Sequence, residues 1–268
     1  MLIIESILIF LFGLCIGIFL NVVIFRVLSG ESLRGRSHCQ KCLKTLRWYE
    51  LFPLASFVWQ KGRCRSCQEK ISWQYPLVEL ITAVLFLLIF QHFYGNWAEM
   101  ILWIVVASAF VVLFFTDLKE YILPDVIVIP LIAVLFLYRT FQSFYLGSFD
   151  FFANFVIASF LIALPFFLFY AISGGRMIRT GIFKIEWMGM GDSKLIFLAG
   201  LLLCWPKILI AVMFAVFLGS LWGILLMFLK KFTLKSAMPF GPFIILGAFL
   251  SLYFGDIIYE WYINWLFF

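Results

Sequence analysis

The chain has 268 residues, of which 65% are hydrophobic and only 13% are charged, and its mean hydropathy is +1.09. Soluble domains are close to half apolar and a quarter charged, so this composition excludes an ordinary soluble protein and indicates the lipid bilayer as its solvent. A net charge of +6 would suggest nucleic acid as the partner of a soluble protein. In a membrane protein it reports orientation, and we expect no nucleic-acid partner.

Eight apolar runs are long enough to cross, or nearly cross, the hydrocarbon core of a bilayer, which is about 30 Å thick. The first run lacks a basic start and a small-residue cleavage site and carries Glu5, so we expect a retained helix. The fold class is therefore an all-α polytopic membrane protein with about eight transmembrane helices. The expected spans cover residues 3–25, 76–94, 97–116, 123–143, 152–173, 194–206, 207–229 and 240–265.

The distribution of Lys and Arg residues predicts the orientation of these spans. With eight crossings, 18 of the 20 basic residues fall on one side, and only Arg139 and Lys207 fall on the other. Basic loops stay in the cytoplasm, so both termini should face outward. The chain then divides into a first helix (1–25), a cytoplasmic insert (26–75) and a membrane core (76–268).

Residues 26–75, called the insert below, hold ten of the 20 basic residues and four of the six cysteines. Cys39 and Cys42 form one CxxC pair, Cys64 and Cys67 form another, and 21 residues separate the pairs. Each CxxC turn points two thiolates at one metal ion, so two turns complete a tetrahedral zinc site. The alternatives are two disulfides or four unrelated thiols, but disulfides are disfavoured because a cytoplasmic loop lies in a reducing compartment. We expect a small zinc-ribbon-like insert with structural zinc.

Acidic residues at the ends of spans are the candidates for catalysis, because an ionisable side chain at membrane depth is costly. Asp117 ends the third expected span, and Asp192 opens the sixth within Gly189-Met190-Gly191-Asp192, so both helix ends meet the same membrane face. Two carboxylates that share a proton there would form an aspartyl dyad, in which one activates water and the other protonates the peptide carbonyl. Gly189 and Gly191 leave room for an extended substrate backbone beside Asp192.

Two further acids lie toward the same face. Asp125 follows Pro124 at the start of the fourth span, which is an ordinary position for an acid in the first turn of a helix. Glu79 follows Pro76 in a similar context. We interpret both as structural, with Asp125 as the rival for the second place in the dyad.

Over about residues 13–250 the chain resembles the bacterial type IV prepilin peptidases. The motifs that carry the resemblance are Cys39-x-x-Cys42, Cys64-x-x-Cys67, Tyr75-Pro76-Leu77-Val78-Glu79-Leu80, the stretch from Asp117 to Leu123-Pro124-Asp125, Gly189-Met190-Gly191-Asp192 and Pro239-Phe240-Gly241-Pro242. The resemblance implies that Asp117 and Asp192 are the catalytic pair of an intramembrane aspartyl peptidase. Its substrates would be prepilins and pseudopilins, cleaved after a glycine at the cytoplasmic face of the bacterial inner membrane.

The resemblance also implies a second activity. Many members of the family N-methylate the new N-terminus with S-adenosylmethionine, and the residues linked to this step correspond here to Gly62 and Arg63. Two positions depart from the family pattern, since Ile18 stands where serine is usual and no proline follows Arg26. The shorter archaeal preflagellin peptidases are similar around Asp192 but lack the insert.

Two other classes of function compete with the peptidase. The buried acids would suit a proton-coupled transporter, and the insert would suit a non-catalytic scaffold that holds partners. No inverted repeat is apparent in the sequence, and the acids cluster at the faces instead of the midplane, which favours the peptidase. Its substrate would belong to a type IV pilus, a type II secretion system or a DNA-uptake system.

Overall fold

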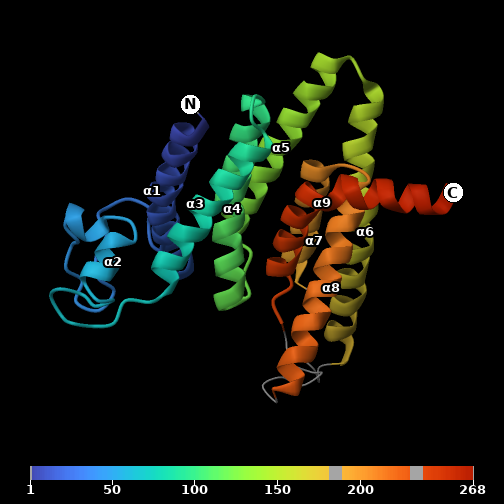
Figure 1. Ribbon diagram of the computed structural model, residues 1–268. Helices are drawn as coiled ribbons and strands as arrows, with labels where there is room; N and C mark the ends of the chain where they lie inside the picture. Colours follow the sequence, from blue (N-terminus) through green and yellow to red (C-terminus); the bar gives the residue numbers. More distant parts are fainter. Residues whose placement is uncertain (1, 181–188, 230–237, 268) are drawn as a thin grey trace. The chain divides into compact units, whose positions relative to one another are not determined.

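The computed structural model describes residues 2–180, 189–229 and 238–267. Within these ranges all the continuous secondary-structure elements are helices (Figure 1). Two isolated β-bridges, both in the insert, are the other regular backbone pairings in the described residues. The helices in chain order are α1 (Leu2–Ser29), the 3-10 turn η1 (Trp48–Leu51), α2 (Ala55–Trp59), α3 (Gln74–His92), α4 (Trp97–Glu120), α5 (Asp125–Leu146), α6 (Phe149–Thr180), α7 (Met190–Leu203), α8 (Lys207–Phe228) and α9 (Gly241–Phe267).

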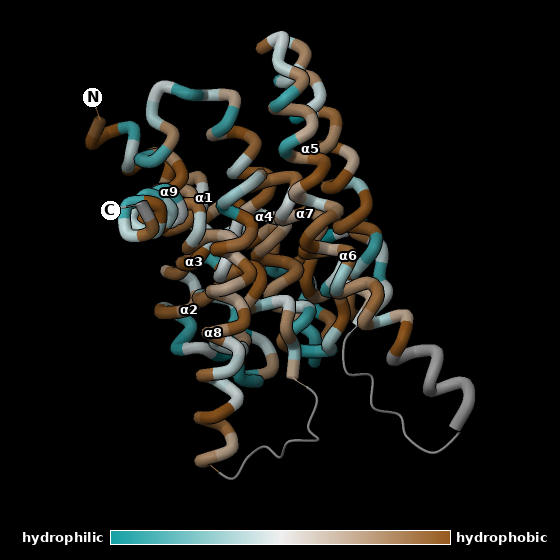
Figure 2. Tube along the Cα trace, turned by 90° about the vertical axis from the view of Figure 1, so that its right-hand side faces the viewer, coloured by the Kyte–Doolittle hydropathy of each residue, from teal (hydrophilic) through white to brown (hydrophobic). Residues whose placement is uncertain are grey.

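Seven of these helices are long and apolar enough to cross a bilayer, namely α1, α3, α4, α5, α6, α8 and α9. Hydrophobic residues cover most of their length (Figure 2). The sixth expected span forms α7, which has only 14 residues and is therefore about 21 Å long, shorter than the hydrocarbon core. The chain is thus a multi-pass membrane protein, as predicted, with one of the eight expected helices too short for a full crossing.

The chain forms two compact units, residues 1–115 and 116–268. The second unit is organised around α7, which contacts α5, α6, α8 and α9. Ten of the 14 residues of α7 are buried. A helix that is apolar around its whole circumference needs neighbours on every side, so α7 forms the core of this unit.

Polar side chains fix both ends of α7 to α5. At the C-terminal end, the buried Arg139 donates from Nη2 to the carbonyl of Leu202 at 2.7 Å and from Nε to that of Leu201 at 3.4 Å. The last carbonyls of a helix have no intrahelical donor, and a cation there complements the helix dipole. At the N-terminal end, Lys194 Nζ donates to Asp125 Oδ1 at 2.7 Å. These contacts set the position of the first turn of α7.

Close helix packing in the first unit depends on two glycines of α1. A Cβ added at Gly13 would lie 2.6 Å from the Cα of Ala83 in α3, and one added at Gly17 would lie 2.6 Å from the Cα of Glu79. Small residues four positions apart let two membrane helices approach until their backbones touch. Glu79 is therefore held against α1 at the point where the insert joins the membrane helices.

Candidate active site and metal centre

Asp117 lies in the last turn of α4 and is only 4% exposed. The helix ends because Tyr121 adopts a left-handed conformation, with φ of 56°, and its amide donates to the carbonyl of Asp117 at 3.0 Å. The backbone amide of Gly241 interacts favourably with the Asp117 carboxylate. Within the described part of the chain, Asp117 Oδ2 is buried without a hydrogen-bond partner. A buried carboxylate oxygen of this kind needs a proton, a water molecule or a substrate group.

Asp192 lies in the first turn of α7 and is 8% exposed. Gly189 precedes the helix in an extended conformation and accepts a hydrogen bond from the amide of Asp192 at 3.2 Å. The amide of Gly189 also interacts with the Asp192 carboxylate, and the charges of Asp192 and Asp117 act on each other. The structure therefore brings together the two carboxylates that the sequence analysis selected, from residues 75 positions apart in the chain.

Glycines surround this pair, and they differ in how much space they leave. A Cβ at Gly241 would lie 2.6 Å from Asp117 Oδ2, whereas a Cβ at Gly191 would lie 3.0 Å from the Cβ of Leu123. Among the described residues, a Cβ at Gly189 would have just one atom within 4 Å, the amide nitrogen of Gly191 at 3.9 Å. Gly241 was not selected as a site residue from the sequence. Its place within Pro239-Phe240-Gly241-Pro242, at the start of the last expected span, was the signal available.

The two other acids considered above have structural partners. Asp125 pairs with Lys194, and its side chain is 54% exposed. Glu79 lies in the other unit of the chain, where its Oε2 accepts a hydrogen bond from the amide of Leu54 at 2.7 Å. Asp117 is thus the acid whose charge acts on Asp192, while Asp125 forms a half-exposed ion pair with the same helix.

The four cysteines of the insert converge on one point. Their Sγ atoms all lie within 4.8 Å of one another, and those of Cys39 and Cys67 are 3.8 Å apart. Four sulfurs at about 2.3 Å from a tetrahedral zinc ion are separated by about 3.8 Å, so the cluster fits zinc. Backbone amides of Cys67 and Ser66 donate to Cys64 Sγ and lower the pKa of this thiol to about 7, which favours the thiolate that zinc binds.

The two CxxC turns have the same backbone structure, 25 residues apart. In each turn the amide of the first cysteine donates to the carbonyl five residues later, and its carbonyl accepts from the amide four residues later. Leu43 and Gln68, at equivalent positions, both have positive φ, 56° and 58°. Equivalent β-bridges close the turns, His38 with Thr45 and Arg63 with Lys70. The sequence shows this repeat only through its cysteines.

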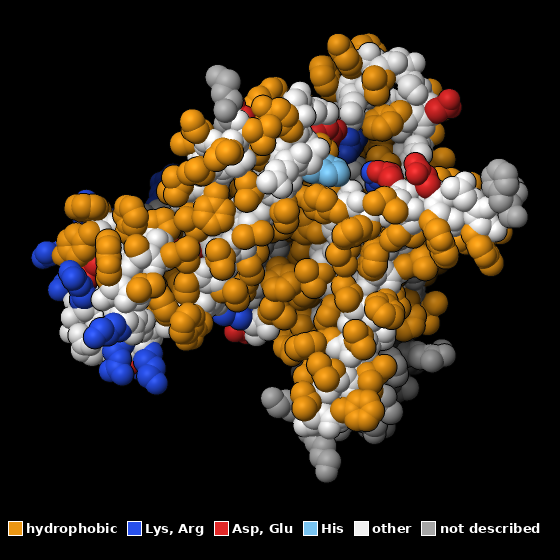
Figure 3. Space-filling model, viewed as in Figure 1, with side chains coloured by type: hydrophobic (Ala, Val, Ile, Leu, Met, Phe, Trp, Pro, Cys, Tyr) orange, Lys and Arg blue, Asp and Glu red, His pale blue; other side chains and the backbone are white. Residues whose placement is uncertain are grey.

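Gly62 and Arg63 immediately precede the second CxxC turn, where they correspond to Ser37 and His38 of the first. Gly62 has φ of 65°, and a Cβ there would lie 3.2 Å from Cζ of Phe57. Glycine is therefore required both by the backbone conformation and by the aromatic ring above it. Lys and Arg side chains gather over the surface of the insert (Figure 3).

Comparisons with known proteins identify the family of this chain. Two family models match, "Bacterial Peptidase A24 N-terminal domain" over residues 11–93 and "Type IV leader peptidase family" over residues 104–224. The chain is therefore a polytopic membrane protein of the peptidase class.

Relatives that carry the name prepilin leader peptidase/N-methyltransferase match along nearly the whole chain. The protein of Aeromonas salmonicida is 31% identical over 96% of this chain and 93% of its own length, and that of Bacillus subtilis is 31% identical over 95% and 96%. The protein of Myxococcus xanthus is 36% identical over 83% of this chain and 63% of its own length. No solved structure matches significantly. The chain belongs to the type IV leader peptidase family and is an enzyme.

Proposed function

We propose that this protein cleaves the leader peptide of prepilins or pseudopilins with Asp117 and Asp192 as its catalytic pair. The observation that carries the proposal is the meeting of two buried carboxylates, one of which has an oxygen without a partner among the described residues. Two carboxylates this close cannot both ionise freely, so they share a proton. The pair therefore has both the base and the acid that peptide hydrolysis needs.

The chemistry follows from the shared proton. The ionised carboxylate takes a proton from a water molecule while the oxygen of that water attacks the peptide carbonyl carbon. The protonated carboxyl group donates its proton to the carbonyl oxygen. When the carbon–nitrogen bond breaks, the leaving amine takes up a proton from the pair. A peptide can approach because Gly189 and Gly191 place no side chain beside Asp192, and Gly189 is exposed. We expect a glycine before the scissile bond for the same reason.

The basic residues support the membrane side on which this reaction takes place. The insert is strongly basic, and basic loops stay in the cytoplasm. The dyad would therefore lie at the cytoplasmic face of the bacterial inner membrane, where the substrate's own basic leader is retained by the same rule. Since like charges repel, the apolar helix behind the leader would supply most of the affinity.

Methylation of the new N-terminus is the second proposed activity, and the names of the relatives support it. Bound S-adenosylmethionine would supply an electrophilic methyl group, so that a nitrogen–carbon bond forms as a carbon–sulfur bond breaks and the amine gives up a proton. We propose that zinc on Cys39, Cys42, Cys64 and Cys67 is structural, because the four thiolates leave no position for a substrate. Gly62 and Arg63 remain our candidates for a role in methylation.

The test is cleavage of a purified prepilin by the purified protein, scored by mass spectrometry. Asp117→Asn and Asp192→Asn should each lower turnover by at least about 10²–10⁴-fold, the usual contribution of acid–base catalysis, while zinc content stays unchanged. Asp256→Asn is the matched control, since Asp256 is an exposed acid paired with Lys207 at 2.8 Å. Near-normal turnover by either dyad variant contradicts the assignment. Normal processing of a substrate with a bulky residue in place of its glycine contradicts the extended-backbone approach.

A further inference from the structure

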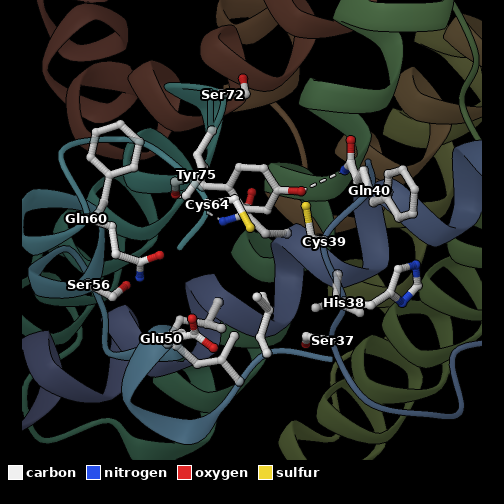
Figure 4. Close-up of a pocket in the computed structure, with 18 of the residues that line it drawn as sticks. Ser37, His38, Cys39, Gln40, Glu50, Ser56, Gln60, Cys64, Ser72 and Tyr75 are labelled. Atoms are coloured by element: carbon white, nitrogen blue, oxygen red, sulfur yellow. Dashed lines mark hydrogen bonds between the residues drawn. The ribbon is translucent and has the colours of Figure 1, made fainter. Parts of the chain in front are cut away.

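A cavity of about 330 Å³ lies where the insert meets α1 and the first turns of α3 (Figure 4). Its walls are contributed by three consecutive segments of the chain: the second half of α1, both halves of the insert, and the start of α3. A cavity of this size is within the range that binds small molecules. It lies entirely in the first unit of the chain and contains neither Asp117 nor Asp192, so the cleavage mechanism does not use it.

Two buried polar atoms of residues that line this cavity are unsatisfied. Asn21 is 3% exposed and Arg26 is 4% exposed, and within the described residues Asn21 Oδ1 and Arg26 Nη1 have no hydrogen-bond partner. The rest of each side chain is anchored. Asn21 Nδ2 donates to the carbonyls of Gly17 and Tyr75, and Arg26 Nη2 donates to carbonyls of the insert. A buried polar group without a partner costs free energy. We therefore expect a ligand that donates a hydrogen bond to Asn21 Oδ1 and accepts one from Arg26 Nη1.

Beside these two side chains, α3 contributes a buried carboxylate to the lining of the cavity. Glu79 is 9% exposed and accepts a hydrogen bond from the amide of Leu54. Leu54 is the centre of a tight turn with φ of 54° and ψ of −47°, closed by a hydrogen bond from the amide of Ala55 to the carbonyl of Pro53. Three-residue turns whose central residue has a positive φ are rare and strained, and strained backbone of this kind is concentrated at binding sites. The turn holds Glu79 where it can attract a cation.

The remaining wall is largely apolar and aromatic. Phe57 lines the cavity, packs against Trp73 in a tilted arrangement with ring centroids 4.9 Å apart, and is backed by Gly62. Tyr75 also lines the cavity, and its hydroxyl accepts a hydrogen bond from Gln40 Nε2 at 2.7 Å (Figure 4). Aromatic walls suit a planar heterocycle. A ligand that fits would combine a flat ring with a small head group bearing a carboxylate and cationic groups.

We propose that this cavity binds S-adenosylmethionine and that Arg26, Asn21 and Glu79 recognise its amino-acid end. Arg26 Nη1 donates to the carboxylate, Asn21 Oδ1 accepts from the ammonium group, and Glu79 faces the positive charge of the ligand. The proposal rests on the methyltransferase half of the proposed function and gives it a location. It also explains how Gly62 could act on methylation without touching the ligand, because a side chain there would push Phe57 into the cavity.

The experiment is isothermal titration of the full-length, zinc-loaded protein with two probes. S-adenosylhomocysteine carries the amino-acid end, and 5′-deoxy-5′-methylthioadenosine lacks it. Arg26→Gln should weaken binding of S-adenosylhomocysteine by about ten- to hundred-fold, the value of a hydrogen bond to a charged group, and leave binding of methylthioadenosine unchanged. Arg34→Gln, an exposed insert residue outside the cavity, should change neither affinity.

Each other result overturns the proposal. Equal losses for both probes would mean that Arg26 supports the insert and not the ligand's carboxylate. Unchanged binding of both would place the ligand elsewhere. If Arg26→Gln loses its zinc, the unsubstituted protein still decides the question, because it must bind S-adenosylhomocysteine at least tenfold more tightly than methylthioadenosine. A protein that cleaves prepilin but neither binds S-adenosylhomocysteine nor methylates removes this proposal and leaves the peptidase intact.

Discussion

Between residues 27 and 75 Cys64 is the only buried residue, whereas ten of the 14 residues of α7 are buried. The insert has no apolar core of its own, so its fold depends on the four cysteines and on a few contacts with α1 and α3. Structural zinc contributes about 10–16 kcal/mol in small domains, enough to replace such a core. By contrast, α7, whose first turn carries Asp192, contacts four other helices and has one polar anchor at each end.

Because the two regions are stabilised differently, a substitution that disrupts the insert should leave the region around α7 intact, and the reverse should also hold. Loss of metal should disorder the insert and leave α7 in place, because the four cysteines belong to the first unit of the chain and α7 belongs to the second. A change in the packing around α7 should disturb the aspartate pair and leave zinc content unchanged. Substitutions in each region can therefore be scored by both prepilin cleavage and zinc content.

Gly241→Ala should have the largest effect, on the aspartate side. The added methyl group would lie 2.6 Å from Asp117 Oδ2, and the carboxylate must move to relieve the contact. Gly241 does not have a positive φ, so the backbone accepts alanine and the effect is purely steric. A displacement of this size costs about 10²-fold in catalysis, and we expect prepilin cleavage to fall by that factor.

The matched control is Gly223→Ala in α8, where, within the part of the chain that the structure describes, a new Cβ would approach just the end of Met238, at 3.9 Å. This variant should cleave normally. Zinc content should be unchanged in both variants. Normal cleavage by Gly241→Ala would mean that Asp117 is not held as tightly as the structure indicates.

Cys39→Ser should have the next largest effect, on the insert side. One ligand of four is lost, so zinc content measured by elemental analysis should fall well below one ion per chain. Methylation should fall more than cleavage, because the aspartates lie on helices that form without the insert. Cys15→Ser is the control, since Cys15 is an exposed free thiol on α1. Equal loss of both activities would show that the insert also supports the peptidase.

The sequence predicted the parts of this molecule that depend on local pattern. Apolar length predicted the helices, cysteine spacing predicted the cluster, and helix-end position paired Asp117 with Asp192 before the structure brought them together. The sequence did not predict that Arg139 caps the C-terminal end of α7, or that Gly241 lies close to the Asp117 carboxylate. Each of these joins residues more than 60 positions apart and depends on how helices are packed, which the hydrophobic pattern does not specify.

Arg139→Gln should have a moderate effect and tests whether α7 needs its polar anchor. The carbonyls of Leu201 and Leu202 would lose charged donors in a buried setting, which costs about 1–3 kcal/mol. We expect a lower thermal unfolding temperature for the second unit and a modest loss of cleavage, with zinc content unchanged. Arg65→Gln, an exposed residue of the insert, is the control. An unchanged unfolding temperature in Arg139→Gln would show that apolar packing alone fixes α7.

Asp125→Asn should have the smallest effect, and it separates the pair proposed here from its rival. Asp125 bonds Lys194 at 2.7 Å, but the side chains are 54% and 24% exposed, and exposed ion pairs contribute only about 0–1 kcal/mol. If Asp125 only steadies the first turn of α7, the variant should keep most of its cleavage activity, with a loss of a few fold at most. Lys194→Met removes the other half of the same pair and should cause a similar small loss, because both variants break one contact. If Asp125→Asn instead abolishes cleavage while Lys194→Met does not, Asp125 has a chemical role of its own. The second carboxylate of the catalytic pair would then be Asp125, and the burial of Asp117 would need another explanation.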